Sequence, residues 1–331
     1  MEPRVDVVVG LPTPHRVDTT LNSPLTCLRL PYAPPQALFS RKDLTMKLAN
    51  LDGRAVVVTP EGVIDLNTAS RGRFTTSLDA SVTRIAEIRQ WLAAARPKAD
   101  PTTTLAMLEA DASRLGPPVT DPRQIFAIGL NYRDHSAENN APVPDAPLVF
   151  TKWPSSLAGP AAEIPLPNET VDWELELVVV IGEGGRNIPS DKAFDHVAGF
   201  CVGQDISERT MQLAGFPPQF SLAKSYQAFS PIGPWLTTLD ELDDPNDLAL
   251  SSTYNAETIQ KGRTSDLIFD IPTLISHLSS VCELRPADLI FTGTPAGVGN
   301  ACKPPRYLAP GGVLNSTIEG LGGLSNTCTT P

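Results

Sequence analysis

The chain has 331 residues and a mass of 35.4 kDa, a length that suits one large domain with a smaller attachment. Hydrophobic residues make up 41% and charged residues 19% of the sequence, a balance that excludes global disorder. The 26 basic and 37 acidic residues give a net charge of −11, which disfavours binding to nucleic acid or to an anionic membrane surface.

The five cysteines form no Cys-x-x-Cys pair, so they indicate neither a disulfide framework nor a structural zinc site. No apolar run approaches the ~20 residues that span a bilayer, and no basic segment followed by a long apolar stretch opens the chain. The sequence therefore predicts a soluble, cytoplasmic protein.

Residues 1–45 contain scattered prolines and one short apolar run, Val7-Val8-Val9, without a sustained period. We interpret them as an arm or an upstream extension, disordered in one interpretation, with Met46 as an alternative start. They have no counterpart in the resemblance described below.

The pattern changes at Met46. Two β-rich runs, Gly53–Val58 and Val63–Leu66, flank a turn at Pro60-Glu61-Gly62 and predict a hairpin. Apolar residues then recur at helical spacing from Leu78 to Ala95, which predicts one helix that ends before Pro97. Residues 46–115 are therefore expected to form a small N-terminal α+β domain.

After a candidate linker at Gly116-Pro117-Pro118, β-type runs separated by proline and glycine dominate residues 120–331. The predicted strands are 125–130, 147–151, 171–181, 198–202, 232–237 and 289–292. The chief helical signal runs from Asp270 to Leu284. The pattern predicts an α+β fold whose larger, β-rich domain carries the chemistry.

The segment from Val171 to Gly182 alternates with a period of two, so Asp172, Glu174 and Glu176 share one face of a strand. Glu174 and Glu176 would lie ~7 Å apart, with a mutual repulsion of ~2.4 kcal/mol at a dielectric constant of 20. The residues that follow, 178–180, are three valines, which indicates that both faces run into the interior. Two carboxylates in such a place need a cation or a proton.

The alternative is that the glutamates lie on the wet side of an antiparallel strand, as most Glu-x-Glu pairs do. A third carboxylate, Asp205, follows another apolar run. Because these ligands are oxygens and the chain has four histidines, a site made by the three would favour Mg²⁺ or Mn²⁺ over zinc.

Several ordered segments together resemble the fumarylacetoacetate hydrolase family, in particular its short-chain acylpyruvase and 2-hydroxyhepta-2,4-diene-1,7-dioate isomerase-like members. The resemblance covers about residues 125–324 and rests on six segments: 125–138, the two carboxylate segments, the lysine segment 220–235, the glycine-rich turn 291–299 and the C-terminal strand 311–320. It implies a β-rich roll of mixed sheets with a small N-terminal domain, assembled as a homodimer.

The resemblance also implies roles for individual residues. One Mg²⁺ or Mn²⁺ per chain would be bound by Glu174, Glu176 and Asp205. His135 and Glu138 match a His-x-x-Glu pair that activates water, and Lys224 matches a lysine near the metal and the substrate oxygens. The implied substrate contacts are Arg209, Gln212, Thr294 and Tyr132.

The predicted activity is hydrolysis of the C–C bond of a 1,3-diketo acid, such as an acylpyruvate or fumarylpyruvate. His135, oriented by Glu138, would deprotonate a water that attacks the distal carbonyl, and Lys224 would stabilise the oxyanion. A pyruvate-type enolate would then remain on the metal. The nearest alternative on the same site is decarboxylation or keto-enol tautomerisation of a 2-oxo diacid such as oxaloacetate. A non-catalytic metal-organised binding protein is a third interpretation, disfavoured because both His135 and Lys224 are retained.

Two positions depart from the family pattern. Gln204 stands where the family often has asparagine, and Glu208 stands where it often has alanine. Glu208 is expected to add a negative charge near the site, which leaves the charge of the substrate open. Lys152 is equally compatible with a pocket-lining position and with a plain strand end.

Overall fold

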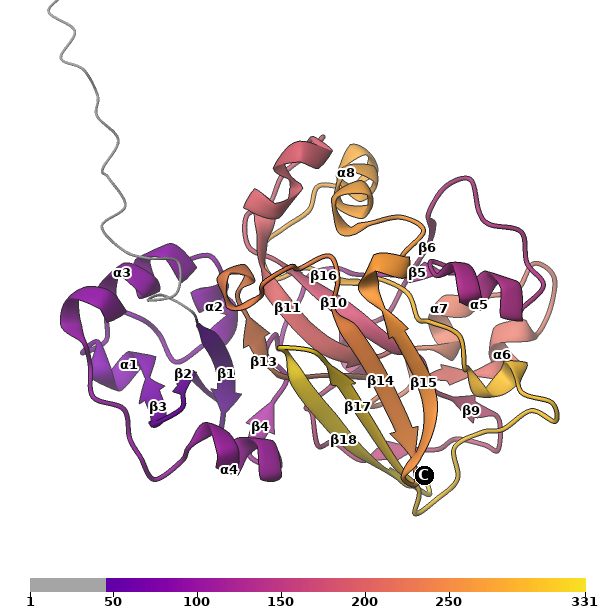
Figure 1. Ribbon diagram of the computed structural model, residues 1–331, viewed down its shortest axis with the longest axis horizontal. Helices are drawn as coiled ribbons and strands as arrows, with labels where there is room; N and C mark the ends of the chain where they lie inside the picture. Colours follow the sequence, from indigo (N-terminus) through magenta and orange to yellow (C-terminus); the bar gives the residue numbers. More distant parts are fainter. Residues whose placement is uncertain (1–45) are drawn as a thin grey trace, which may run out of the picture. The chain divides into compact units, whose positions relative to one another are not determined.

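The computed structural model describes residues 46–331, and the predicted arm at residues 1–45 lies outside them. Strands dominate the described part and helices are short, which confirms the predicted α+β class (Figure 1).

The N-terminal segment begins with three antiparallel strands. They are β1 (Lys47–Leu51), β2 (Arg54–Thr59) and β3 (Gly62–Asp65). The pairs between β2 and β3 run from Val56↔Asp65 to Thr59↔Gly62, which confirms the predicted hairpin. Gly62 closes the turn with φ +156°, and a Cβ there would lie 2.2 Å from the carbonyl oxygen of Asp100.

Four helices follow. They are α1 (Leu66–Ala69), α2 (Leu78–Val82), α3 (Ile85–Ala95) and α4 (Leu105–Ala110). The prediction of one helix over residues 78–95 is wrong at Thr83 and Arg84, because Arg84 leaves the helical conformation with φ −120° and ψ 17°. Its guanidinium instead donates to the carbonyl of Arg73 and lies 4.7 Å from the ring centre of Phe74. A tertiary contact thus outweighs the helical periodicity.

The largest sheet has eleven strands and joins both halves of the described chain. Its further members are β4 (Leu115–Gly116), β5 (Ile125–Gly129), β6 (Leu148–Thr151), β7 (Leu157–Ala158), β10 (Leu175–Ile181), β11 (Val197–Gln204), β13 (Ser230–Thr237) and β16 (Leu289–Phe291). The order is β3-β2-β1-β13-β11-β10-β16-β5-β6, with β4 on β1 and β7 on β13. Leu48 of β1 pairs with Leu236 of β13, so residues 46–115 and 120–331 share one sheet within one compact unit.

A second sheet packs against β10, β11 and β13. Its order is β15 (Glu257–Arg263), β14 (Ala249–Tyr254), β17 (Val313–Ile318), β18 (Gly322–Thr329) and β8 (Ile164–Pro165). A separate two-stranded ladder joins β9 (Val171–Asp172) to β12 (Ser207–Glu208). The predicted C-terminal strand is β17, whereas β18 was not predicted, because it begins with two glycines and continues with mostly polar residues.

The remaining helices lie within residues 120–331. They are α5 (Arg133–Glu138), α6 (Arg209–Leu213), α7 (Phe220–Ala223), α8 (Ile271–Val281) and the 3₁₀ turns η2 (Pro154–Ser156), η3 (Ser190–His196), η4 (Leu239–Glu241), η5 (Thr264–Asp266) and η6 (Gly299–Ala301). The predicted helix over 270–284 is α8, which begins after its cap Asp270 and ends three residues early. No helix among residues 46–331 is long and apolar enough to cross a membrane.

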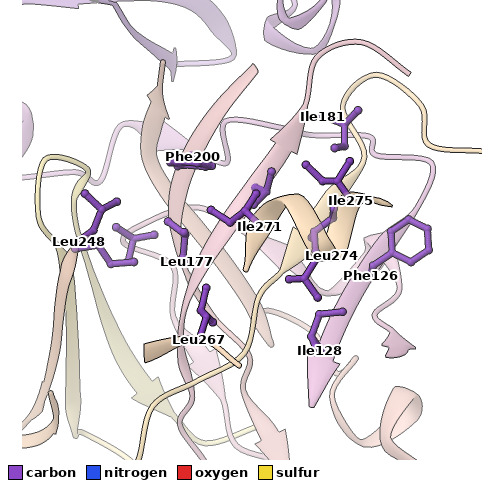
Figure 2. Close-up of a cluster of buried hydrophobic side chains, with 14 of the residues drawn as sticks. Phe126, Ile128, Leu177, Ile181, Phe200, Leu248, Leu267, Ile271, Leu274 and Ile275 are labelled. Atoms are coloured by element: carbon purple, nitrogen blue, oxygen red, sulfur yellow. The ribbon is translucent and has the colours of Figure 1, made fainter. Parts of the chain in front are cut away.

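Strand β10 separates two hydrophobic cores. Leu177 and Val179 point into a core shared with α8 and the second sheet, shown in Figure 2, whereas Val178 and Val180 point into the core on the opposite face. Every residue of β10 is buried, as the valine run predicts. Glu174 and Glu176, which share the alternation of Val178, therefore approach the site from an interior strand.

Candidate active site

The site forms where the predicted strand over residues 171–181 is interrupted. Trp173 and Glu174 separate β9 from β10, so the chain loses its ladder partners there. The side chain of Gln204 accepts the N–H of Glu174 at 2.9 Å, and that of Gln260 accepts the N–H of Leu175 at 2.9 Å. Two buried amides thus replace the missing strand partners and hold the break in one conformation.

The three predicted metal ligands meet at this break. Leu175 pairs with Gln204 across β10 and β11, and the N–H of Asp205 donates to the carbonyl of Glu174 at 2.8 Å. One oxygen each from Glu174, Glu176 and Asp205 lies within 4.8 Å of the others. Their exposed fractions are 7%, 1% and 0%, which excludes the alternative of a wet strand face.

Two lysines neutralise part of this charge. The Nζ of Lys224 lies 2.7 Å from Oε2 of Glu174 and 2.6 Å from Oδ2 of Asp205. The Nζ of Lys152, fully buried, lies 2.6 Å from Oδ1 of Asp205 and donates to the carbonyl of Lys224. Lys152 follows the end of β6 and is part of the buried charge network, but it does not line the cavity, so it matches neither alternative that the sequence left open.

Glu176 has no cationic side chain at hydrogen-bond distance among the described residues, and its Oε2 accepts only the N–H of Gly293 at 2.8 Å. Burial, reinforced by the charges of Asp205 and Glu174, raises the pKa of Glu176 well above its usual range. Burial acts the same way on Glu174, but the charges of Lys224 and Arg209 outweigh it and lower its pKa. The carboxylate without a counter-ion stands where a cation would be expected.

The residues present fit a hard divalent cation. All three donors are carboxylate oxygens, which Mg²⁺ and Mn²⁺ prefer. A carboxylate oxygen has two lone pairs, so Glu174 and Asp205 can bind a metal while still accepting hydrogen bonds from the lysines.

Arg209, at the start of α6, is held by Asp172. Its Nε and Nη2 donate to Oδ2 of Asp172 at 2.9 and 2.7 Å, and its Nη2 lies 2.7 Å from Oε1 of Glu174. Asp172 also accepts the N–H groups of Gly299 and Asn300. Sequence reasoning placed Asp172 on the acidic face but gave it no role; its partners come from segments far away in the chain.

His135 and Glu138, the predicted pair, lie one turn apart on α5. The Nδ1 of His135 is 3.2 Å from Oε2 of Glu138, while Oε1 of Glu138 accepts the N–H of Gly297 at 2.9 Å. Glu138 therefore both orients the imidazole and fastens α5 to the glycine-rich turn. In the tautomer whose Nδ1–H donates to Glu138, Nε2 is the basic nitrogen.

Thr294 lies in that turn and lines the cavity. Its Oγ1 accepts a hydrogen bond of 2.8 Å from Nε2 of Gln260, so its own O–H is available to a ligand. Gln260 was missed because it lies within a polar strand, β15, where nothing local distinguishes it.

Tyr132 is not brought to the cavity. It is fully buried in the hydrophobic core, in one cluster with Leu175 and Leu267. Its hydroxyl has no hydrogen-bond partner among residues 46–331, and burial, with the nearby charge of Glu176, raises its pKa.

The two departures from the family pattern have structural partners. Gln204 braces Glu174 and donates to Ser316 at 2.8 Å. Glu208 accepts the N–H groups of Thr210 and Met211 at 2.8 Å, so it caps α6 and does not line the cavity. The negative charge of Glu208, which was expected near the site, therefore lies at the N-terminus of α6.

Seven of the ten predicted site residues line a cavity of about 220 Å³, and Tyr132, Glu138 and Asp205 are not part of that lining. Its lining comprises Ile128, Gly129, Leu130, His135, Asn139, Ala141, Phe150, Glu174, Glu176, Arg209, Gln212, Leu213, Phe220, Lys224, Thr294, Val298 and Asn300. A larger hollow of about 600 Å³ beside α3 and η4 contains none of the predicted residues.

Residues 124–329 match the family described as fumarylacetoacetate (FAA) hydrolase C-terminal. The mitochondrial oxaloacetate tautomerase of Xenopus laevis is 42% identical over 211 residues, which are 63% of this chain and 66% of that protein, just under two thirds of its length.

Two solved structures share the fold. Fumarylacetoacetate hydrolase from Exiguobacterium antarcticum is 32% identical with a TM-score of 0.72, over 86% of this chain and 100% of that one. Maleylpyruvate hydrolase from Sphingobium sp. SYK-6, in complex with manganese(II) and pyruvate, is 27% identical with a TM-score of 0.69, over 86% and 99%.

Proposed function

The chain belongs to the fumarylacetoacetate hydrolase family, and from that premise we propose that it is a divalent-metal-dependent hydrolase of the C–C bond in a 1,3-diketo acid, such as an acylpyruvate. One observation carries the proposal: a histidine paired with a carboxylate lines the same cavity as two members of a buried carboxylate triad. That combination supplies a base for water beside a site for a cation.

Glu174, Glu176 and Asp205 would hold one Mg²⁺ or Mn²⁺. When bound, such an ion polarises the 2-oxo group and offsets the negative charge that develops as the C–C bond breaks. The buried network has four carboxylates and three cationic side chains, namely Asp172, Glu174, Glu176, Asp205, Lys152, Arg209 and Lys224. A divalent ion would therefore leave one positive charge for a monoanionic substrate.

His135 is proposed as the base. Its Nε2 removes a proton from a water, which attacks the carbonyl distal to the substrate carboxylate, while the charge of Glu138 stabilises the imidazolium. When the C–C bond breaks, the imidazolium returns the proton to the leaving carbon, so a carboxylic acid and pyruvate are released.

Lys224 is proposed to stabilise the oxyanion that forms during the reaction, and Thr294 to bind the substrate carboxylate. The ammonium of Lys224 faces the buried carboxylates at the inner end of the cavity, where it can stabilise the oxyanion. The hydroxyl of Thr294 is available to donate to the substrate carboxylate. Gln212 also lines the cavity, and because its Oε1 accepts from Arg209, its amide nitrogen is proposed to donate to an oxygen of the substrate.

A second candidate is tautomerisation or decarboxylation of a 2-oxo diacid. It is favoured by the 42% identity to the frog protein, which is named an oxaloacetate tautomerase. The same cation site would serve it, but attack by water would not be required. His135 at the cavity wall supports the hydrolase as the leading candidate.

The two functions are separated by incubating the purified protein with acetylpyruvate and Mg²⁺ or Mn²⁺, and identifying the products by NMR. Acetate and pyruvate in equal amounts, absent after addition of EDTA, are expected. Intact acetylpyruvate together with accelerated ketonisation of oxaloacetate would contradict the hydrolase and establish the tautomerase.

A further inference from the structure

We propose that the outer group of the substrate is short, uncharged and apolar, so that this protein prefers acylpyruvates with an aliphatic or aromatic acyl group to substrates that carry a second carboxylate. This inference deepens the proposed function and rests on it. It rests on the side chains that line the cavity, because both cationic ones are paired with buried carboxylates at the inner end.

Arg209 is the first of two cationic side chains that line the cavity. Its three nitrogens contact Asp172, Glu174 and Gln212 at 2.7–2.9 Å. Because Asp172 is itself fixed by two backbone N–H groups of η6, this guanidinium cannot turn outward without leaving a buried carboxylate unpaired.

Lys224 is the second. Its ammonium lies between Glu174 and Asp205 and 5.1 Å from the ring centre of Phe150. With 2% of its side chain exposed, it reaches the substrate only at the inner end. Neither cation is therefore placed to pair with a carboxylate at the mouth.

The wall that leads outward is apolar. The rings of Phe150 on β6 and Phe220 on α7 pack edge to face with centres 5.6 Å apart. Leu213 follows on α6 with 56% of its surface exposed, and Leu130 and Ala141 complete the apolar lining. Exposure thus rises from the buried carboxylates through the two aromatic rings to the mouth.

The polar groups near this wall do not favour an anion. The amide nitrogen of Asn139 already donates to the carbonyl of His135 at 2.9 Å, and Glu138 adds a negative charge beside it. A second carboxylate would lose its hydration against aromatic rings without gaining a charged partner, whereas an alkyl or aryl group would bury apolar surface there. The volume of about 220 Å³ limits that group to a short chain or a single ring.

The test compares two 2-oxo acids of equal length that differ only at the far end, 2-oxohexanoate with a methyl group and 2-oxoadipate with a carboxylate. Their affinities for the Mn²⁺-loaded protein are measured by calorimetry at 0.15 M salt, so the readout is binding and not turnover. We expect 2-oxohexanoate to bind at least tenfold more tightly. Equal affinity, or tighter binding of 2-oxoadipate, would overturn the inference.

A charge added to the wall should reverse part of that preference. Ala141→Lys places an ammonium at the lining, and Val143→Lys places the same charge two residues away, at an exposed position that does not line the cavity. We expect Ala141→Lys to improve the relative affinity for 2-oxoadipate at least threefold over Val143→Lys. If the ratio of the affinity for 2-oxoadipate to that for 2-oxohexanoate is the same in the two variants, the outer group does not lie against this wall.

Failure of the inference is distinguishable from failure of the proposed function. If acetylpyruvate is cleaved and 2-oxoadipate is still preferred, the inference alone is wrong. If neither 2-oxo acid binds and acetylpyruvate stays intact, both are wrong.

Discussion

At the scale of single residues, Glu176 differs from every other carboxylate of the site. Glu174, Asp172 and Asp205 each contact at least one cationic side chain, whereas Glu176 accepts only a backbone N–H. A buried carboxylate with no counter-ion is costly, so binding of a cation should change its environment more than that of its neighbours.

Replacing this side chain should therefore abolish metal binding without unfolding the protein. Glu176→Gln keeps an oxygen for the N–H of Gly293 but removes the charge. We expect wild type to bind one Mn²⁺ per chain by calorimetry and to melt at a higher temperature with Mn²⁺, and the variant to show neither effect. Glu169→Gln, the same change at an exposed position, is the control. One Mn²⁺ bound by the Glu176 variant would remove this residue from the ligand set.

His135 is predicted to act on water and not on the metal. His135→Ala should lower kcat for acetylpyruvate by about 10²–10⁴, the usual contribution of a general base, while the Mn²⁺ stoichiometry stays at that of wild type. His277→Ala removes a histidine of α8 that lies outside the cavity and should leave kcat unchanged. A His135 variant with near wild-type kcat would show that another group activates the water.

At the scale of elements, the site depends on a strand break held by side chains. Gln204 and Gln260 accept the two N–H groups that the interruption between β9 and β10 leaves without strand partners. Gln260 also donates to Thr294 and to the carbonyl of Pro295, so one amide connects β10, β15 and the glycine-rich turn. Such a network is stable only when each member is satisfied.

Removing this amide should cost stability as well as activity. Gln260→Leu leaves the N–H of Leu175 buried and unpaired, which costs about 1–3 kcal/mol. We expect the free energy of unfolding in urea to fall by at least that amount. Gln90→Leu, at an exposed position of α3, should change it by no more than about 0.5 kcal/mol. Equal effects of the two substitutions would show that the break is held by other contacts.

Helix α5 is fastened to the glycine-rich turn through one carboxylate, and two variants separate its two contacts. Glu138→Ala removes both the partner of His135 and the acceptor of Gly297, so amide exchange of Gly297 and of α5 should accelerate and kcat should fall. Glu138→Gln keeps an oxygen for Gly297 but no charge for His135, so exchange should stay near wild type while kcat falls. Accelerated exchange in both variants would show that the charge, and not the acceptor, holds the helix.

At the scale of the whole molecule, one face carries large apolar side chains that the described chain does not cover. The exposed fractions are 40% for Leu148, 39% for Val149, 44% for Trp153, 99% for Phe216 and 63% for Leu222. These residues lie on and beside β6, α6 and α7; α7 contacts both α6 and β6, and β6 is the edge strand of the large sheet. An exposed apolar edge favours association.

We therefore propose that this face is the interface of a homodimer. Sedimentation equilibrium of the wild type is expected to give twice the 35.4 kDa of the chain, and the double variant Phe216→Asp/Leu222→Asp is expected to give the monomer mass. Val281→Asp puts a charge on an apolar residue of α8 with 69% exposure and should leave the dimer intact. A wild type that sediments as a monomer, or a dimer that Val281→Asp dissociates, would contradict this assignment.

The features that depend on local pattern could be predicted from the amino-acid sequence. The alternation over Val171–Ile181 identified a buried strand with carboxylates at one end, because strand side chains alternate whatever lies around them. His135 and Glu138 are three residues apart, and residues with that spacing are neighbours on the surface of a helix. The family resemblance followed from ordered motifs and is borne out by the match over residues 124–329.

The contacts between residues far apart in the chain could not be predicted and became apparent in the folded protein. That Lys152 pairs with Asp205, Asp172 with Arg209, and Gln260 with Leu175 depends on strand order and register across segments separated by 37 to 85 residues. Tertiary packing likewise buries Tyr132 in the core and interrupts the predicted helix at Arg84, and Glu208 is the N-cap of α6. Local periodicity reports which face a side chain occupies, whereas its partners depend on how the sheets assemble.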